Sequence, residues 1–290
     1  MGKHHRPLNH PPQGRVRRFL STPKGYVLAT LLALMVIGAV YKPDRPGVIH
    51  VGAALATALV VDLVVSVVRR HQRWLSDGGA VTGIIVGLIL SPSAHVSVVV
   101  LTTAVAVLSK HVLKSGRKPI FNPAAVGLLV ATFAFSVGQS WWGDLADLPV
   151  WCVVLLLAAG YLVVHRVNKF PQVLSFLGTY FVLLTITGYL QWGHAAYSPG
   201  DALRTPLISC ALFMAFFMLT DPPTSPAKYG DQVWFGVIAA VIGTGVYLLF
   251  GGLTYLLIGL LAANGWKAWR GRRTSKPKRV NEPMQAAQIS

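Results

Sequence analysis

Apolar runs alternate with short segments of Gly, Pro and charged residues along most of the chain, and this pattern predicts a bundle of membrane helices. The runs predict about ten helices, at 26–41, 48–68, 79–90, 95–108, 122–137, 149–164, 171–190, 206–219, 233–250 and 253–266. Several runs are shorter than the roughly 20 residues that a straight span needs. We therefore expect an all-α integral membrane protein in which the third and eighth helices are short or broken.

The positions of Lys and Arg indicate how these helices are oriented. If the N-terminus is inside, all but three of the 26 Lys and Arg residues fall in inner segments, and the exceptions are Lys42, Arg45 and Arg204. Positive charge gathers on the cytoplasmic side of membrane proteins, and a miscount by one helix would scramble this alternation. The pattern predicts a multi-pass protein of the cell (inner or plasma) membrane, with both termini in the cytoplasm.

Composition excludes several classes of protein. Hydrophobic residues make up 53% of the chain and charged residues 12%, so lipid is the expected solvent for most of it. The formal net charge of +17 comes from short basic clusters between apolar runs, which favours basic loops over nucleic-acid binding. Cys152 and Cys210 lie far apart in apolar runs, so we expect neither a disulfide framework nor a metal site.

The chain divides into a basic cytoplasmic segment at 1–25, a membrane domain at 26–269 and a basic flexible tail at 270–290. Two short segments, GIIVGLILSPS and MAFFMLTDPPTSP, both end in a Ser- or Pro-rich turn and are five helices apart. An odd spacing gives opposite orientations, which indicates two inverted five-helix repeats at about 26–138 and 149–269. Two unrelated turns are the alternative explanation.

Two inner segments are candidates for a binding site. The basic loop with Lys110 and Gly116 leads into Asn122 and Pro123, an N-cap followed by Pro at the first helical position. A good helix start explains that pair, but the basic loop would also suit an anionic group such as a phosphate or a flavin ring. No residue pattern indicates soluble catalysis.

The second candidate segment is the Pro-rich turn TDPPTSP, which holds Asp221, Thr224 and Ser225. The turn either caps itself through these side chains or forms a polar pocket facing the basic loop.

Asp62 lies about two turns inside the second helix and is a candidate for an ion pathway, because a carboxylate in the membrane is costly unless it is paired or hydrated. Snorkelling toward Arg69 or Arg70 is the alternative. His50, His111, His165 and His194 lie at or near helix ends, which argues against a bis-histidine haem.

Four segments carry a family resemblance that spans most of the chain from Arg18 to Gly265. In order, they are RFLSTPKGY, AVTGIIVGLILSPS, the loop ending in IFNPAAVG, and FMAFFMLTDPPTSPAKYGDQVWFG. They resemble the RnfD membrane protein of Rnf-type electron transport complexes and its relative NqrB of the sodium-translocating NADH:quinone reductase. The resemblance implies ten helices in inverted halves, a flavin, electron transfer coupled to ion movement, and other electron transport subunits as partners. It marks Asn122, Pro123, Asp221, Thr224 and Ser225 as family-motif positions.

One departure concerns the cofactor. Members of the family attach FMN to the threonine of an SGAT-type motif in the outer segment after the FNPA helix, whereas this chain has VGQSWWGDLADLP there, with no threonine. We expect no covalent flavin and, if a flavin is bound, FMN or riboflavin held noncovalently. Trp141 and Trp142 in this segment are predicted to anchor the outer surface, with stacking on a ring as the alternative.

Three functions stay open from the sequence. The first is a subunit or stand-alone relative of an Rnf-type complex that transfers electrons through a noncovalent flavin. The second is a small-solute or ion transporter or channel with the same fold and no cofactor. The third is a membrane scaffold for partner proteins, which includes an accessory role in a biosynthetic cluster.

Overall fold

The computed structural model describes residues 22–41, 45–69, 77–116, 118–146, 148–149, 151–193 and 207–274. Its helices are α2 (Pro23–Tyr41), α3 (Arg45–Val68), α4 (Asp77–Ile89), α5 (Val96–Val112), α6 (Pro123–Phe135), α7 (Cys152–Val167), α8 (Phe170–Tyr189), α9 (Leu207–Phe213), α10 (Tyr229–Phe250) and α11 (Tyr255–Thr274). α9 continues directly into the π-helix η3 (Met214–Leu219), and η1 (Trp142–Asp144) is a short 3-10 helix. Strands β1 (Lys114–Ser115) and β2 (Lys118–Pro119) form a small antiparallel hairpin.

Every predicted helix overlaps one of these segments, and the differences lie at the ends. α11 continues to Thr274, so the prediction of a flexible tail is wrong for residues 270–274. The apolar run that predicted this helix ends earlier, but the Lys and Arg residues that follow are good helix formers and extend it. Several predictions lie outside the described residues: those on 1–21 and 275–290, on Lys42, Arg70 and Arg204, and on His194.

The fold is that of an all-helical, multi-pass membrane protein. Within the described residues, α2, α3, α8 and α10 are long and apolar enough to cross a membrane, and the other apolar helices are shorter. α3 exposes Val60, Val64 and Val67 on its outer face, where lipid is the natural solvent.

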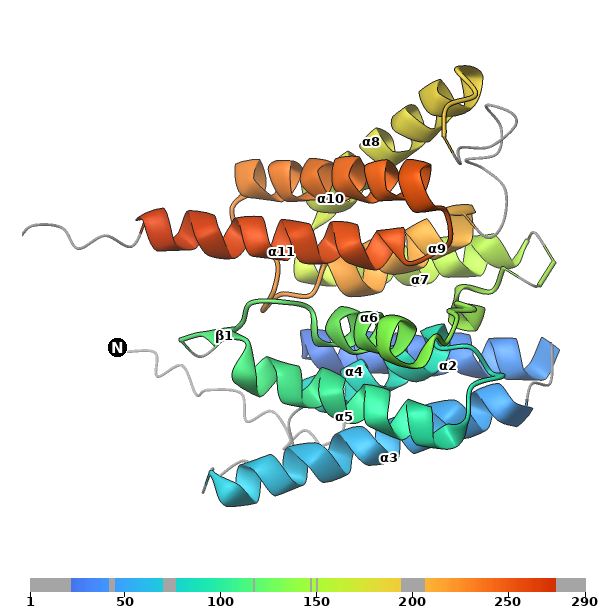
Figure 1. The fold of residues 1–290 in the computed structure, drawn as a ribbon, viewed down its shortest axis with the longest axis vertical. Helices are drawn as coiled ribbons and strands as arrows, with labels where there is room; N and C mark the ends of the chain where they lie inside the picture. Colours follow the sequence, from blue (N-terminus) through green and yellow to red (C-terminus); the bar gives the residue numbers. More distant parts are fainter. Residues whose placement is uncertain are drawn as a thin grey trace, which may run out of the picture.

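Figure 1 shows the helices side by side in two groups, α2–α6 below and α8–α11 above. In the first group α3 packs on α4 and α5, and α5 packs on α6; in the second, α8 packs on α10, and α10 on α11. The groups meet where α6 contacts α11 and where α2 contacts α7. The β1–β2 hairpin and the C-terminal end of α11 lie at the same side of the molecule, on the left in Figure 1.

The short helix α4 ends inside the protein, where other elements bind its last carbonyl groups. The backbone N–H groups of Ser140 and Trp141 donate to the Ile89 carbonyl at 2.9 and 3.1 Å, and Trp142 Nε1 donates to the Gly87 carbonyl at 2.9 Å. These bonds allow the helix to end where water is excluded. The prediction that Trp141 anchors the outer surface is wrong, because its side chain is fully buried and packs edge-on against Phe213.

The π-helix η3 ends in the same way at the opposite side. Asn122 Nδ2 donates to the Met218 carbonyl at 3.2 Å, and Gln172 Nε2 donates to the Leu219 carbonyl at 2.5 Å. Side chains from α8 and from the start of α6 therefore fix the end of η3, which leads into the Pro-rich turn.

Candidate functional site

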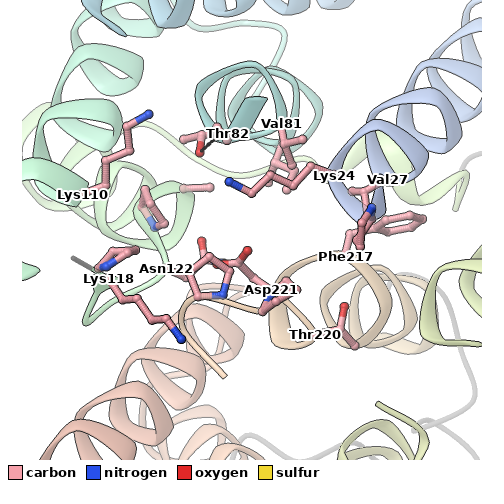
Figure 2. A pocket seen from close by; sticks show the side chains of 18 of the residues that line it. Lys24, Val27, Val81, Thr82, Lys110, Lys118, Asn122, Phe217, Thr220 and Asp221 are labelled. Carbon is pink, nitrogen blue, oxygen red and sulfur yellow. Dashed lines mark hydrogen bonds between the residues drawn. The ribbon is translucent and has the colours of Figure 1, made fainter. Parts of the chain in front are cut away.

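A cavity of about 800 Å³ lies at the side of the molecule that carries the hairpin. Its walls come from the start of α2, the start of α4, the end of α5, the hairpin, the start of α6 and the turn after η3. Figure 2 shows Asn122 and Asp221 near its centre, with Lys110 and Lys118 on one side and Val27 and Phe217 on the other. Segments that are far apart in the sequence thus form one pocket.

Asn122 joins three elements at the edge of this cavity. Its Oδ1 accepts the backbone N–H of Ala125 at 3.2 Å, and Pro123 follows at the first helical position, which confirms the predicted helix start. Its own backbone N–H donates to Asn264 Oδ1 of α11 at 2.9 Å. Because Asn122 also donates to the end of η3, its main role in the site is to position the walls.

The TDPPTSP turn caps itself and also contributes to the cavity. Asp221 Oδ2 accepts the Thr224 hydroxyl at 2.9 Å, and the Asp221 carbonyl accepts the Ser225 hydroxyl at 2.8 Å. Thr224 and Ser225 are buried inside the turn, whereas Asp221, Pro222 and Pro223 line the cavity. The turn therefore caps itself, and one part of it also forms a polar wall of the cavity.

The charge of Asp221 depends on opposing influences. Burial raises the pKa of the Asp221 carboxyl above its usual range. The Thr224 hydroxyl and the nearby ammonium groups of Lys24 and Lys267 act in the opposite direction and lower this pKa.

Three side chains from neighbouring helices hold the backbone of this turn. Asn264 Nδ2 donates to the Thr224 carbonyl at 3.1 Å, and Lys267 Nζ donates to the Pro223 carbonyl at 2.7 Å. Lys169 Nζ donates to the Pro226 carbonyl, and burial together with the charge of Lys267 lowers the pKa of Lys169 to about 8. Carbonyl groups of the turn are thus bonded by side chains of α11 and by Lys169 at the N-cap of α8.

Asp62 lies just behind the cavity wall. Its side chain is 1% exposed, and its Oδ1 is 2.5 Å from Lys110 Nζ and 3.4 Å from His111 Nε2. Its Oδ2 is buried with no hydrogen-bond partner among the described residues, against the backbone of Gly79 in α4. Lys110 and His111 both line the cavity, so the ion pair connects Asp62 to the pocket.

The cavity also contains residues that were not among the predicted site positions. Lys24, Thr82 and Phe217 all line it. The family resemblance could have identified these residues, because all three lie in the segments that carry it: Lys24 in RFLSTPKGY, Thr82 in AVTGIIVG and Phe217 in FMAFFMLTDPP. Gly116, which was predicted, lines the cavity from the hairpin turn, where its φ of 61° favours glycine.

Part of the segment after α6, around residues 141–145, is packed inside the protein. Asp144 is 1% exposed, and its carboxylate accepts the Ala146 backbone N–H at 2.7 Å and the Cys210 thiol at 3.1 Å. The Asp144 carboxylate therefore links this segment to Cys210 in α9.

The fold and the cavity define a multi-pass helical membrane protein with a pocket enclosed by helix ends and turns and lined by several Lys and Arg residues. The model of the NQR2, RnfD, RnfE family matches the chain over residues 9–150 and 149–255, and the chain belongs to this family. No curated protein sequence matches the chain.

Proposed function

We propose that the protein is a membrane subunit, or a stand-alone relative, of an Rnf-type electron transport complex, and that it holds a flavin noncovalently in the inner cavity. The observation that supports this proposal is the cavity itself, which the family-like segments around Lys24, Thr82, Asn122 and Asp221 enclose together. Its volume falls within the roughly 300–1,000 Å³ of small-molecule pockets.

The residues of the cavity fit a flavin. Val27, Val81, Ile85 and Phe217 offer an apolar wall for a flat ring system, and the lysines offer charge for polar or anionic groups. A bound flavin would supply one- and two-electron transfer, which amino-acid side chains do not provide at ordinary potentials. The chain itself would bind and orient the ring and limit the access of water.

The proposal includes the topology of the protein. In it, ten helices form two inverted five-helix repeats with both termini in the cytoplasm. The equivalent contacts within α2–α6 and α7–α11, and the capped ends of α4 and η3 at opposite sides, support this arrangement. The basic residues that line the cavity, which include Lys24, Arg69, Lys110, Lys114 and Lys118, support a cytoplasmic position for this side of the molecule.

Ion movement and partner subunits complete the proposal. The buried ion pair of Asp62 with Lys110 lies beside the cavity, and this position supports a role of Asp62 in ion movement. Since the outer segment has no threonine for covalent flavin, a further redox group would come from other subunits.

The experiment is to purify the protein in mild detergent, record its visible absorption spectrum and precipitate it with acid. We expect a yellow protein whose colour passes entirely into the supernatant. Val81→Trp, which fills the cavity, should abolish the colour, whereas Val40→Trp on the exposed face of α2 should retain it.

A colourless parent protein would contradict the proposal. Solute or ion flux through vesicles that contain it would then support a transporter, and activity only in the presence of partner proteins would support a scaffold.

A further inference from the structure

We infer that the C-terminal end of α11 is a binding site for the headgroup of an anionic phospholipid. This site lies outside the cavity, so it does not depend on which ligand the cavity holds. It follows from two stacked arginine–tryptophan pairs, formed by Trp266, Trp269, Arg270 and Arg273, which together are the Trp–Arg face of α11.

The two pairs repeat along one face of the helix. The guanidinium carbon of Arg270 lies 5.3 Å from the centre of the Trp266 ring, and that of Arg273 lies 3.9 Å from the centre of the Trp269 ring. In each pair the partners are four residues apart, and helical periodicity places all four side chains on the same side of α11. Stacking on an indole orients a guanidinium group, and the N–H groups at its edge donate to planar acceptors such as a phosphate.

The Trp–Arg face lies where α11 leaves the membrane domain. Residues 255–265 of this helix are largely apolar, whereas residues 266–274 contain four Lys and Arg residues. Arg270 pairs with Asp231, near the start of α10, at 2.9 Å. Figure 1 shows the end of α11 extending beyond the start of α10. The face is therefore at the edge of the apolar part of the bundle.

Exposed aromatic side chains mark the same level on α10. Tyr229 and Trp234 lie in its first two turns and are 57% and 58% exposed, and Trp269 on α11 is 51% exposed. Because Asp231 lies between the first two in the sequence and pairs with Arg270, these aromatic rings are close to the Trp–Arg face. Tyr and Trp concentrate at the headgroup level of membranes. The two stacked guanidinium groups are thus expected at the depth of the lipid phosphates.

The charge of this end of the helix favours an anion. α11 contains no acidic residue, and Arg272 adds an exposed cation beside the Trp–Arg face. Asp231 offsets the charge of Arg270 in part. Phosphatidylglycerol carries a net negative charge, whereas the choline cation of phosphatidylcholine balances its phosphate. A site built from arginine and tryptophan at the membrane edge should therefore distinguish these two lipids.

The test is native mass spectrometry of the full-length protein, delipidated in detergent and mixed with equal amounts of phosphatidylglycerol and phosphatidylcholine. We expect the parent protein to bind phosphatidylglycerol preferentially. Arg270→Gln/Arg273→Gln should weaken that binding by about fivefold for each arginine, the size expected for one cation at an anionic surface, and leave phosphatidylcholine binding unchanged. Arg166→Gln/Lys228→Gln is the matched control, because it removes two exposed cations that are not on this face.

Two further variants separate the stacked site from net charge alone. Arg270→Lys/Arg273→Lys keeps both charges without the planar guanidinium group, and Trp266→Leu/Trp269→Leu removes the stacking partners. Each should weaken phosphatidylglycerol binding severalfold. Full binding in both variants would overturn the inference, because positive charge alone would then attract the lipid.

Other outcomes would also overturn the inference. These are equal binding of the two lipids to the parent protein, a preference that survives Arg270→Gln/Arg273→Gln, and an equal loss in the control. The first would leave an acidic partner protein as the occupant of this face. Arg273→Gln alone keeps the pair of Arg270 with Asp231 and should already weaken phosphatidylglycerol binding about fivefold. An unchanged thermal unfolding midpoint shows that each variant is folded.

Discussion

Asp221 serves the site through the shape of its turn as well as through its charge. Its carboxylate faces the cavity and at the same time accepts the Thr224 hydroxyl at 2.9 Å. Short polar side chains beside prolines commonly bond backbone and neighbouring groups in this way. Loss of the acceptor should therefore disturb the wall of the cavity even where the loss of negative charge would favour an anionic ligand.

Substitutions at Asp221 separate these two effects. Asp221→Ala removes the acceptor, and we expect it to lower the amount of flavin retained on purification severalfold. Asp221→Asn keeps an acceptor oxygen and should retain flavin at or above the parent level. Thr224→Ala should resemble Asp221→Ala, since it breaks the same bond from the other side. The measurement is the ratio of flavin to protein in the acid supernatant, and equal loss in Asp221→Asn and Asp221→Ala would show that charge dominates.

Asp62 shows what sequence can and cannot predict about a site. A carboxylate within an apolar run marks a residue that needs a partner, and this much follows from its position alone. Its partners could not be identified, because Lys110 and His111 lie in a helix that is distant in the sequence. Only the packing of α3 on α5 brings them together. Proximity in the chain had suggested Arg69 and Arg70 instead.

Removing only one partner of the Asp62–Lys110 ion pair should lower the free energy of unfolding. Asp62→Ala leaves the largely buried ammonium group of Lys110 without this carboxylate, and we expect a loss of about 3 kcal/mol in the free energy of unfolding. The double variant Asp62→Ala/Lys110→Met removes both charges and should recover most of that loss. Thermal unfolding in detergent measures both, and a double variant no more stable than Asp62→Ala would contradict this account.

At the scale of the helices, a stripe of glycines allows α4 to lie against α3. Gly79, Gly83 and Gly87 recur every four residues, a spacing that places them on one face. A Cβ on Gly83 would lie 2.8 Å from the Ala54 carbonyl oxygen, and one on Gly87 would lie 2.6 Å from the Val51 Cα. Small residues at this spacing let two membrane helices approach closely. The same contact seats the start of α4 against Asp62 and the cavity.

An added methyl group on this face should separate the two helices. Gly83→Ala is expected to lower the free energy of unfolding by about 1–3 kcal/mol, because the added Cβ meets backbone atoms that cannot move alone. Gly52→Ala in α3 is the matched control, since no atom lies within 4 Å of its added Cβ and alanine is the better helix former. Thermal unfolding of the two variants checks the prediction, and an equal effect would exclude close packing as the cause.

For the whole molecule, the apolar runs predicted where each helix lies, because the requirement for a membrane span is local in the sequence. The ends of the short helices depend on distant partners and could not be predicted. The Ile89 carbonyl is bonded by Ser140 and Trp141, and η3 is held by Asn122 and Gln172. The burial of Trp141 has the same origin, since an interfacial and a buried tryptophan do not differ in sequence.

The path of the chain places two exposed turns at opposite sides of the bundle. Ser115 lies in the hairpin after α5, and Ser93 lies in the turn between α4 and α5. If α5 crosses the membrane, these residues face different compartments. If the basic side is cytoplasmic, Ser115 is inside and Ser93 is outside.

Single cysteines at these two positions test the topology, because the native Cys152 and Cys210 are buried and give little background. We expect a membrane-impermeant maleimide to label Ser93→Cys in intact cells and Ser115→Cys only in inside-out vesicles. Labelling of both variants in intact cells would mean that α5 does not cross. The reverse pattern would place the cavity at the outer face, where a flavin bound there could not receive electrons directly from a soluble cytoplasmic donor.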